Sequence, residues 1–167
     1  WPQGSWVPII NIGSNWSYLA GPTEMPSNWN TIDFDDSSWP SGPSSIGYGD
    51  DDDITVIEPV VSLYLRKTFL VEDVNEIAHG LIHMDYDDGF VAYLNGVEVV
   101  RENMGEAGTE VLPGDFAATN VEANIYRGLK PRKFFVENIA EYLLEGQNVL
   151  SIQVHNANEN LADLTAL

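Results

Sequence analysis

The residues of this sequence that could do chemistry are mainly acidic, and they fall in two short stretches. Together the stretches supply seven aspartates: Asp50, Asp51, Asp52, Asp53, Asp85, Asp87 and Asp88. Two like charges about 4 Å apart repel by about 1 kcal/mol even in bulk water. A calcium ion relieves such repulsion, since it takes roughly six to eight oxygen ligands from carboxylates and loop carbonyls. We therefore predict that these aspartates are calcium ligands. The alternative is that they form solvated acidic loops.

The second acidic stretch resembles the beginning of an EF-hand calcium loop. Asp85-Tyr86-Asp87-Asp88-Gly89 is similar to D-x-D-x-D-G, but one spacer residue is missing. The twelfth position, which should hold a bidentate glutamate, is a glycine. A tight turn between strands explains the same residues, with Asp side chains bonding nearby backbone N–H groups and Gly89 at positive φ. The turn and a cation shared with another loop both remain open.

Aromatic side chains in loop regions indicate a second kind of site, one for sugars. The apolar C–H face of a pyranose stacks on an exposed aromatic ring while its hydroxyls bond polar neighbours. Trp29 is the main candidate anchor, because it lies among Ser and Asn residues. The predicted ligand-binding residues are Trp29, Tyr48, Tyr86, Tyr126, His155 and Asn156. The alternative is that the aromatics fix loops onto the core and that the last two residues make structural hydrogen bonds.

The composition excludes several other functions. Seven Lys and Arg against 26 Asp and Glu leave a formal charge of −19, so neither nucleic acid nor an anionic membrane is an expected partner. No apolar run approaches the ~20 residues of a membrane helix, so membrane insertion is not expected. The absence of Cys removes thiol chemistry and disulfides. No serine elbow, H-E-x-x-H or P-loop is present. Among 26 acids some pair will always resemble a glycosidase pair, so such a pair is not diagnostic. Because no catalytic motif is present either, we predict no enzymatic activity.

The elements that must position these residues are short strands separated by long loops. Residues 5–19 are typical of two strands, 6–12 and 16–19. Residues 20–62 hold five of the nine prolines and predict an ordered loop with little regular structure. Further strands are predicted over 63–69, 78–84, 90–94, 97–100, 134–136 and 149–155. One or two helical turns are predicted over 138–145, ending before a glycine.

Two strand patterns are specific enough to predict which way side chains point. Asn95-Gly96 favours a two-residue type I′ turn, which would pair Leu94 with Val97, Ala92 with Val99 and Phe90 with Arg101 on the core face. In 149–155, Leu, Ile and Val alternate with Ser, Gln and His, as in a half-buried strand. The consecutive Arg66 and Lys67 must point to opposite faces of their strand, so we expect one exposed and one paired with a carboxylate.

Five motifs occur in an order that resembles a known family. They are FDDSSW at 34–39, IGYGD at 46–50, YLRKTF at 64–69, YDDGFVAYLNGVEVVREN at 86–103 and EGQNVLSIQVHN at 145–156, with ADL at 162–164 in place of a usual Ser-Asp-Leu. Together they look like the galactose-binding-domain-like jelly roll that is an accessory module in secreted multidomain bacterial proteins. The same order is similar to the sugar-binding domain of glycoside hydrolases. The resemblance implies a single all-β domain over 1–167, an antiparallel β-sandwich with long loops and at most one short helix.

The resemblance also implies a function without catalysis, since this domain does not carry the catalytic carboxylates of its hydrolase relatives. We expect a calcium-stabilised carbohydrate-binding accessory module whose partners are a polysaccharide or glycan and the neighbouring domains of a parent protein. The chain begins at Trp1 rather than Met, so we expect a piece of a larger extracellular or cell-surface protein. The alternative is a structural or protein-interaction spacer without glycan binding, because one fold hosts many functions.

Overall fold

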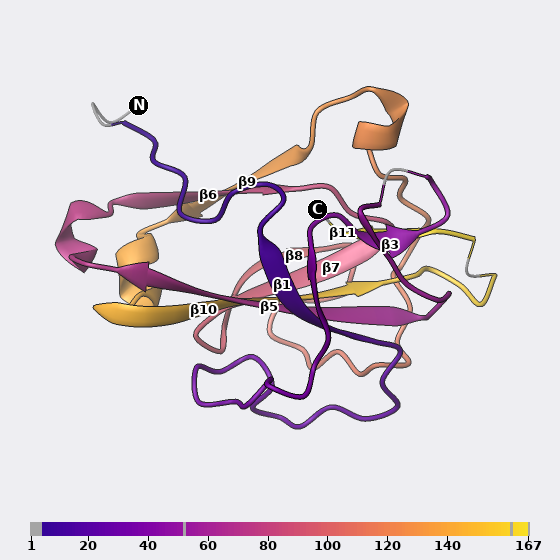
Figure 1. Ribbon diagram of the computed structural model, residues 1–167, viewed down its shortest axis with the longest axis horizontal. Helices are drawn as coiled ribbons and strands as arrows, with labels where there is room; N and C mark the ends of the chain where they lie inside the picture. The colour runs from indigo at the N-terminus through magenta and orange to yellow at the C-terminus, as the bar shows by residue number, and fades with distance from the viewer. Residues whose placement is uncertain (1–4, 52, 161, 167) are drawn as a thin grey trace.

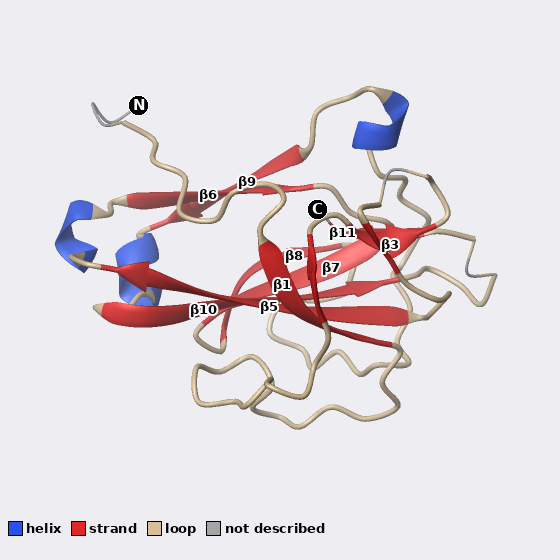
Figure 2. Ribbon diagram, viewed as in Figure 1, coloured by secondary structure: helices blue, strands red, loops and turns tan. Residues whose placement is uncertain are grey.

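The computed structural model describes residues 5–51, 53–160 and 162–166, and it shows an all-β chain (Figure 2). The largest sheet has six strands in the order β2 (Ser41–Pro43), β1 (Asn15–Ala20), β5 (Ser62–Val71), β10 (Gly146–His155), β7 (Gly89–Leu94) and β8 (Val97–Glu102). A three-stranded sheet contains β11 (Leu164–Ala166), β3 (Ile46–Tyr48) and β4 (Thr55–Val56), and a two-stranded sheet contains β6 (His79–Met84) and β9 (Arg132–Glu137). All described pairings are antiparallel except β3 with β4, so the predicted β-sandwich is confirmed.

Within the described residues, helical structure is confined to three short 3₁₀ turns. These are η1 (Val74–Glu76), η2 (Ile125–Arg127) and η3 (Ile139–Tyr142). The last one lies within the predicted helical segment. Gly146, however, begins β10 with φ of 93° instead of ending a helix. The residue that follows η3 is Leu143, and its backbone is already extended. No helix in the part of the chain that the structure describes is long and apolar enough to cross a membrane.

The main hydrophobic core lies between the six-stranded sheet and a second layer that contains β6 and β9, which run above β5 and β10 in Figure 1. Alternate residues of the central strands fill it, because side chains in a strand point to opposite faces. The core residues of these strands are Leu63, Leu65, Phe90, Ala92, Leu94, Leu150, Ile152 and Val154. The core face predicted for 90–94 and for 149–155 is therefore confirmed.

The opposite face of the central strands is also buried, which corrects the expectation of a half-buried last strand. Gln153 and His155 in β10 are 1% and 0% exposed, and Tyr64 in β5 is 0% exposed. The reason is that two long loops, residues 21–40 and 103–118, fold over this face. Loop 21–40, in indigo and purple, lies on the side of the sheet away from β6 and β9 in Figure 1. Polar side chains on this face are thus enclosed between strands and loops.

The β7–β8 hairpin has the predicted turn, but the predicted register holds only next to that turn. Asn95 and Gly96 have φ of 49° and 89°, as a type I′ turn requires, and Leu94 pairs with Val97. Beyond Tyr93 the register shifts, so that Ala92 pairs with Val100 rather than Val99 and Phe90 with Glu102 rather than Arg101. A β-bulge inserts one extra residue into β8 at this point. The bulge depends on packing across the sheet, which the hairpin sequence does not reveal.

The beginning of the chain forms one strand instead of the predicted pair. Residues 5–12 are not in a strand, and Trp6, Val7 and Ile12 are 54%, 73% and 78% exposed. Pro8 lacks the N–H that a sheet ladder needs. Instead β1 pairs with β2 and β5, whose polar backbone groups satisfy its own. The expected long loop with little regular structure holds only the three short strands β2, β3 and β4.

Candidate functional site

A cleft of about 940 Å³ lies on the loop-covered side of the six-stranded sheet. Its residues come from three segments: loop 23–30, the facing side chains of β7, β8 and β10, and loop 108–115. The side chains that line it with polar or aromatic groups are Thr23, Glu24, Ser27, Trp29, Asn30, Tyr93, Glu98, Thr109, Glu110, Asp115 and Gln153. Binding sites for small ligands commonly have volumes of roughly 300–1,000 Å³ and a few convergent polar groups. The cleft has both properties.

The floor of the cleft is a set of hydrogen-bonded polar side chains on the sheet. Gln153 Nε2 donates to the Tyr93 hydroxyl at 2.8 Å, and the Gln153 amide also lies 3.2 Å from His155 Nε2. His155 Nδ1 donates to the backbone carbonyl of Asp115 at 2.8 Å, which ties the floor to the loop above. Burial lowers the pKa of His155 to about 4, so the ring is neutral at physiological pH.

Arg66 holds the loop that forms one wall. Its Nε donates to Asp36 Oδ2 at 2.9 Å, and the guanidinium also donates to the backbone carbonyls of Trp29, Thr31 (3.0 Å) and Phe34 (3.3 Å). Arg66 is 2% exposed, whereas Lys67 reaches outward to the carbonyl of residue 15. The expectation that one of the two pairs with a carboxylate is confirmed for Arg66, whereas Lys67 is half-buried instead of exposed. The FDDSSW and YLRKTF motifs thus meet at one buried ion pair.

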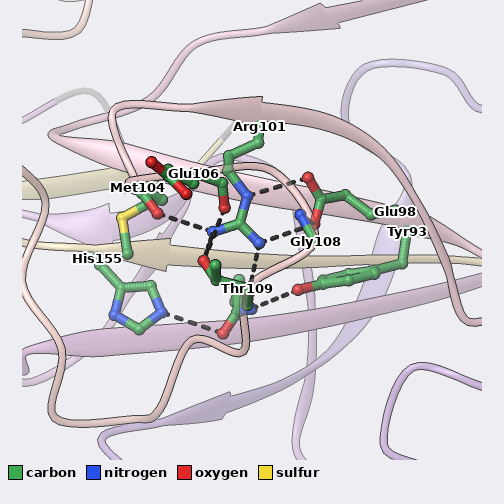
Figure 3. A network of polar contacts seen from close by, with 9 residues as sticks. Tyr93, Glu98, Arg101, Met104, Glu106, Gly108, Thr109 and His155 are labelled. Carbon is green, nitrogen blue, oxygen red and sulfur yellow. Dashed lines mark hydrogen bonds and ion pairs between the residues drawn. The ribbon is translucent and has the colours of Figure 1, made fainter.

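Arg101 holds the opposite wall in the same way (Figure 3). Nε and Nη2 donate to the two carboxylate oxygens of Glu98 at 3.0 and 2.7 Å. The same guanidinium donates to the carbonyls of Met104 and Thr109, both at 2.7 Å. Glu98 also accepts a hydrogen bond from the backbone N–H of Gly108 at 3.1 Å. The loop after β8 is therefore bound to β8 itself, and this fixes the width of the cleft.

Trp29 lines the cleft but does not offer the exposed ring that the sequence led us to expect. It is 7% exposed, and its ring meets those of Tyr64 and Tyr93 edge to face, with centroids 4.8 and 5.7 Å away. The indole face is covered because the loop carrying it folds down onto the polar side of the sheet. Any ligand in the cleft would therefore meet part of the indole and the Tyr93 ring rather than a flat aromatic platform.

A second candidate site is a cluster of three carboxylates at one end of the sandwich. Ligand oxygens of Asp87, Glu122 and Asp163 all lie within 4.8 Å of one another. Burial, with Asp88, Asp163 and Glu122 nearby, raises the pKa of Asp87 to about 8. Burial and the neighbouring Glu122 also raise the pKa of Asp163, whose carboxyl is hydrogen-bonded to that of Asp50. This cluster could hold a metal ion, and carboxylate oxygens are the ligands that hard cations take.

Of the seven predicted metal ligands, only Asp87 belongs to this cluster, and Asp50 adjoins it through Asp163. Asp51 is exposed with φ of 61°, Asp53 is half-buried beside Gly47, and Asp52 lies outside the described residues. Among the described residues of this run, Asp50 is the one that the structure connects to the cluster. A chain of neighbouring carboxylates in a loop cannot point to one centre without the backbone curling around it.

Asp85 and Asp88 are buried and act as acceptors for distant backbone groups. Asp85 accepts from the N–H groups of Asn124 and Ile125, and Asp88 accepts from those of Val121 and Ala157. These bonds cross between loops, so the expectation that the Asp side chains bond nearby backbone groups was wrong, although residues 85–88 do form a short connection between β6 and β7. Gly89 does not have positive φ and instead begins β7. A Cβ there would lie 2.8 Å from Met104 Sδ, so the position needs glycine for space.

The remaining predicted ligand residues lie apart from the cleft or beneath it. Asn156 donates to the Tyr48 hydroxyl at 3.0 Å and to the Val60 carbonyl at 2.8 Å, and both residues are buried. Tyr86 is buried under the guanidinium of Arg132. Tyr126 is 39% exposed and donates to Glu122 Oε2 at 2.5 Å, which places it at the carboxylate cluster.

Sequence reasoning missed residues in both sites. Tyr93 and Gln153 line the cleft, and strand alternation already places both on the face opposite the core. Glu122 and Asp163 complete the carboxylate cluster. They come from a loop without periodicity and from the end of the chain, so only Asp163, within the ADL motif, had a sequence signal.

The comparisons with known proteins show the fold. No protein-family model and no curated protein matches the sequence. A Bifidobacterium dentium β-glucuronidase complexed with coumarin-3-O-glucuronide is 13% identical with a TM-score of 0.54, over 93% of this chain and 21% of that one. A calcium binding mutant of Bacteroides uniformis β-glucuronidase 2 is 16% identical, with a TM-score of 0.56, and the match covers 96% of this chain and 18% of that one. A β-glycosidase from Bacteroides vulgatus is 13% identical, with a TM-score of 0.52, and the match covers 96% of this chain and 20% of that one. The chain spans about a fifth of the length of these enzymes.

Proposed function

We propose that this chain is a non-catalytic carbohydrate-binding module and that the cleft between loops 23–30 and 108–115 is its glycan site. The observation that carries the proposal is the cleft itself, about 940 Å³ in volume with a polar and aromatic lining. The fold adds support, because solved structures with this fold include glycoside hydrolases of which this chain spans about a fifth. A domain of that size within a glycosidase suits an accessory role.

Recognition in this cleft would combine aromatic contact with hydrogen bonds. The Tyr93 ring and the exposed part of Trp29 offer apolar surface for sugar C–H groups. Donors and acceptors for sugar hydroxyls are offered by the Tyr93 hydroxyl and by the side-chain amides of Gln153 and Asn30. The arginines behind both walls keep these groups in place before a ligand arrives, which lowers the entropy cost of binding.

We also propose that a calcium ion occupies the carboxylate cluster of Asp87, Glu122 and Asp163. Crowding and burial raise the pKa of Asp87 and of Asp163, and a divalent cation would stabilise the ionised forms of the three carboxyl groups. None of the three lines the cleft. The ion would therefore order the loops after β6 and before β11 rather than contact a glycan. We further propose that the module is secreted or surface-attached and works beside neighbouring domains.

The test of the glycan site is a titration of the protein with a panel of soluble oligosaccharides, followed by calorimetry. Gln153→Ala and Tyr93→Phe should weaken binding by about tenfold or more, because each removes a polar group at the floor. Gln147→Ala, at the exposed beginning of the same strand, is the matched control and should bind normally. Incubation with the bound glycan should release no reducing sugar. Unchanged affinity in both floor variants, or hydrolysis of the glycan, would contradict the proposal.

A second candidate function is that of a protein-interaction module, and one surface favours it. Trp6, Leu81 and Phe135 are 54%, 36% and 42% exposed on the outer face of β6 and β9, and the Trp6 and Phe135 rings touch edge to face. Exposed apolar patches of this kind often mark protein contacts. Phe135→Ser with Leu81→Ser should abolish an interaction through this face and leave glycan binding unchanged. A loss of glycan binding instead would assign the glycan site to this face.

A further inference from the structure

The walls of the cleft carry acidic side chains and no basic ones. Four carboxylate residues line it, Glu24, Glu98, Glu110 and Asp115, and none of the described lining residues is Lys, Arg or His. A concave site lined by one sign of charge concentrates the electrostatic field and attracts ligands of the opposite sign. The chain as a whole has a formal charge of −19, which reinforces this field. The electrostatics of the site thus disfavour an anionic sugar.

The two guanidiniums behind the walls do not change this conclusion, because Arg66 is engaged by Asp36 and by backbone carbonyls of loop 21–40. Arg101 donates to both carboxylate oxygens of Glu98 and to the carbonyls of Met104 and Thr109, as Figure 3 shows. Its side chain is 5% exposed. A guanidinium is the usual partner of a bound carboxylate, through two parallel hydrogen bonds. Here the two parallel N–H groups of Arg101 already bond Glu98. The carboxylate of a uronic acid would therefore face the carboxylates of the cleft with no free guanidinium to bind it.

Behind the floor of the cleft there is a buried hydroxyl without a hydrogen-bond partner among the described residues. Tyr64 is 0% exposed, and its hydroxyl has no hydrogen-bond partner among the described residues. Its ring packs edge to face against Trp29 at 4.8 Å, and Tyr93 and Asp115 are the charged or titratable groups that act on its hydroxyl. An unsatisfied buried hydroxyl costs about 1–3 kcal/mol. Tyr64 does not itself line the cleft, so the contacts of a ligand with the floor fall to the Tyr93 hydroxyl and the Gln153 amide, which can bond sugar hydroxyls.

We propose that the cleft selects glycans with protonated amino groups, such as the glucosamine units of deacetylated chitin, over neutral and uronic acid chains. This inference rests on the proposed glycan site. The ammonium groups would pair with the carboxylates of Glu110 and Asp115 at the wall, and sugar hydroxyls would bond the floor. The glucuronide in the Bifidobacterium dentium enzyme is of opposite charge. The selectivity argued here follows from the residues of this chain alone.

The test compares tetrasaccharides of glucosamine, N-acetylglucosamine, glucose and galacturonic acid by calorimetry at pH 6. The glucosamine tetramer should bind about tenfold tighter than the neutral ones, and galacturonate should not bind. Raising the salt from about 0.05 M to about 0.3 M should reduce that preference, since surface charges are then screened. Equal affinity for neutral and cationic tetramers would overturn the inference while preserving the glycan site. Absence of binding by all four would overturn both.

A polycation could also bind a highly acidic protein without any specific site, so the variants must separate the cleft from the total charge. Glu110→Gln with Asp115→Asn should remove the preference for glucosamine and retain neutral binding. Glu72→Gln with Glu141→Gln changes the net charge equally at exposed positions that do not line the cleft. This control should keep the preference. If both pairs lose it equally, the selectivity belongs to the overall charge and the inference is wrong. Thermal unfolding of each variant confirms that it is folded.

Discussion

The Nε atom of Arg66 lies 2.9 Å from Oδ2 of Asp36, and the arginine side chain is 1% exposed against 26% for the aspartate. The two residues are 30 positions apart, and their contact binds the loop that carries Trp29 to the middle of the six-stranded sheet. The same guanidinium also donates to three backbone carbonyls of that loop. One buried cation therefore determines the position of a whole wall of the cleft.

Arg66→Met should lower the free energy of unfolding by about 3 kcal/mol, because it leaves a partly buried carboxylate and several carbonyls without their donor. Urea denaturation measures this loss. Lys67→Met is the matched control, since its ammonium is at the surface, and it should change stability by less than about 0.5 kcal/mol. Equal losses in the two variants would show that Arg66 does not hold the loop.

Gly47→Ala should destabilise the protein by at least about 2 kcal/mol, because overpacking displaces neighbouring atoms. A Cβ at Gly47 would lie 2.0 Å from the Leu164 carbonyl oxygen, in the pairing of β3 with β11. At Gly114 a Cβ meets nothing within 4 Å, so Gly114→Ala should be nearly neutral. Thermal unfolding of both variants tests the close approach of the two strands.

Asp87→Asn should abolish the stabilisation that calcium confers and raise the stability of the metal-free protein by about 1 kcal/mol. Burial raises the pKa of Asp87 to about 8 and so opposes folding at neutral pH, whereas an amide needs no proton to be buried. Thermal unfolding in EDTA and in millimolar calcium gives both values. A ligand at one hundred times its Kd stabilises the folded state by about 2.7 kcal/mol. Asp33→Asn, at an exposed position, should retain the full calcium shift. A calcium shift that persists in Asp87→Asn would exclude this cluster as the site.

His155 should make the protein less stable as the pH falls from about 6.5 towards 4. Its folded-state pKa is lowered to about 4 by burial, so the unfolded chain binds the proton first and stability is lost over that range. The loss amounts to about 3 kcal/mol for one such group. Asp87, with its raised pKa, contributes in the opposite direction, because protonation favours the folded state. Urea denaturation at a series of pH values gives the free energy of unfolding against pH for the unsubstituted protein and for His155→Gln. The difference between the two slopes is the contribution of His155. Identical slopes would show that protonation of His155 does not cause the loss of stability.

Arg101→Met should loosen the loop after β8 while lowering global stability by only about 1–2 kcal/mol, because the pair with Glu98 is partly exposed. Limited proteolysis should cut residues 104–112 faster, and glycan affinity should fall about tenfold. Lys133→Met, on exposed β9, should have neither effect. Unchanged proteolysis would mean that Arg101 does not support the wall.

Much of the fold follows from local patterns in the sequence. The alternation in β7 and β10 identified the core face, because a strand repeats every two residues whatever surrounds it. Asn95-Gly96 specified its turn, because few residues tolerate positive φ in succession. The bulge at Ala92 and Tyr93, in contrast, depends on how β8 packs at the edge of the sheet. Local patterns carry no record of such packing.

The two candidate sites show the same division more sharply. The sequence by itself determined that acidic residues and loop aromatics were present, and it singled out Asp87 and Trp29. Only the tertiary structure brought Asp87 together with Glu122 and Asp163, which are 35 and 76 positions away. Only the tertiary structure covered the indole of Trp29 and opened a cleft beside it. The physical reason is that a site is made by side chains whose separation in space depends on loop closure and buried ion pairs, and neither of these repeats along the chain.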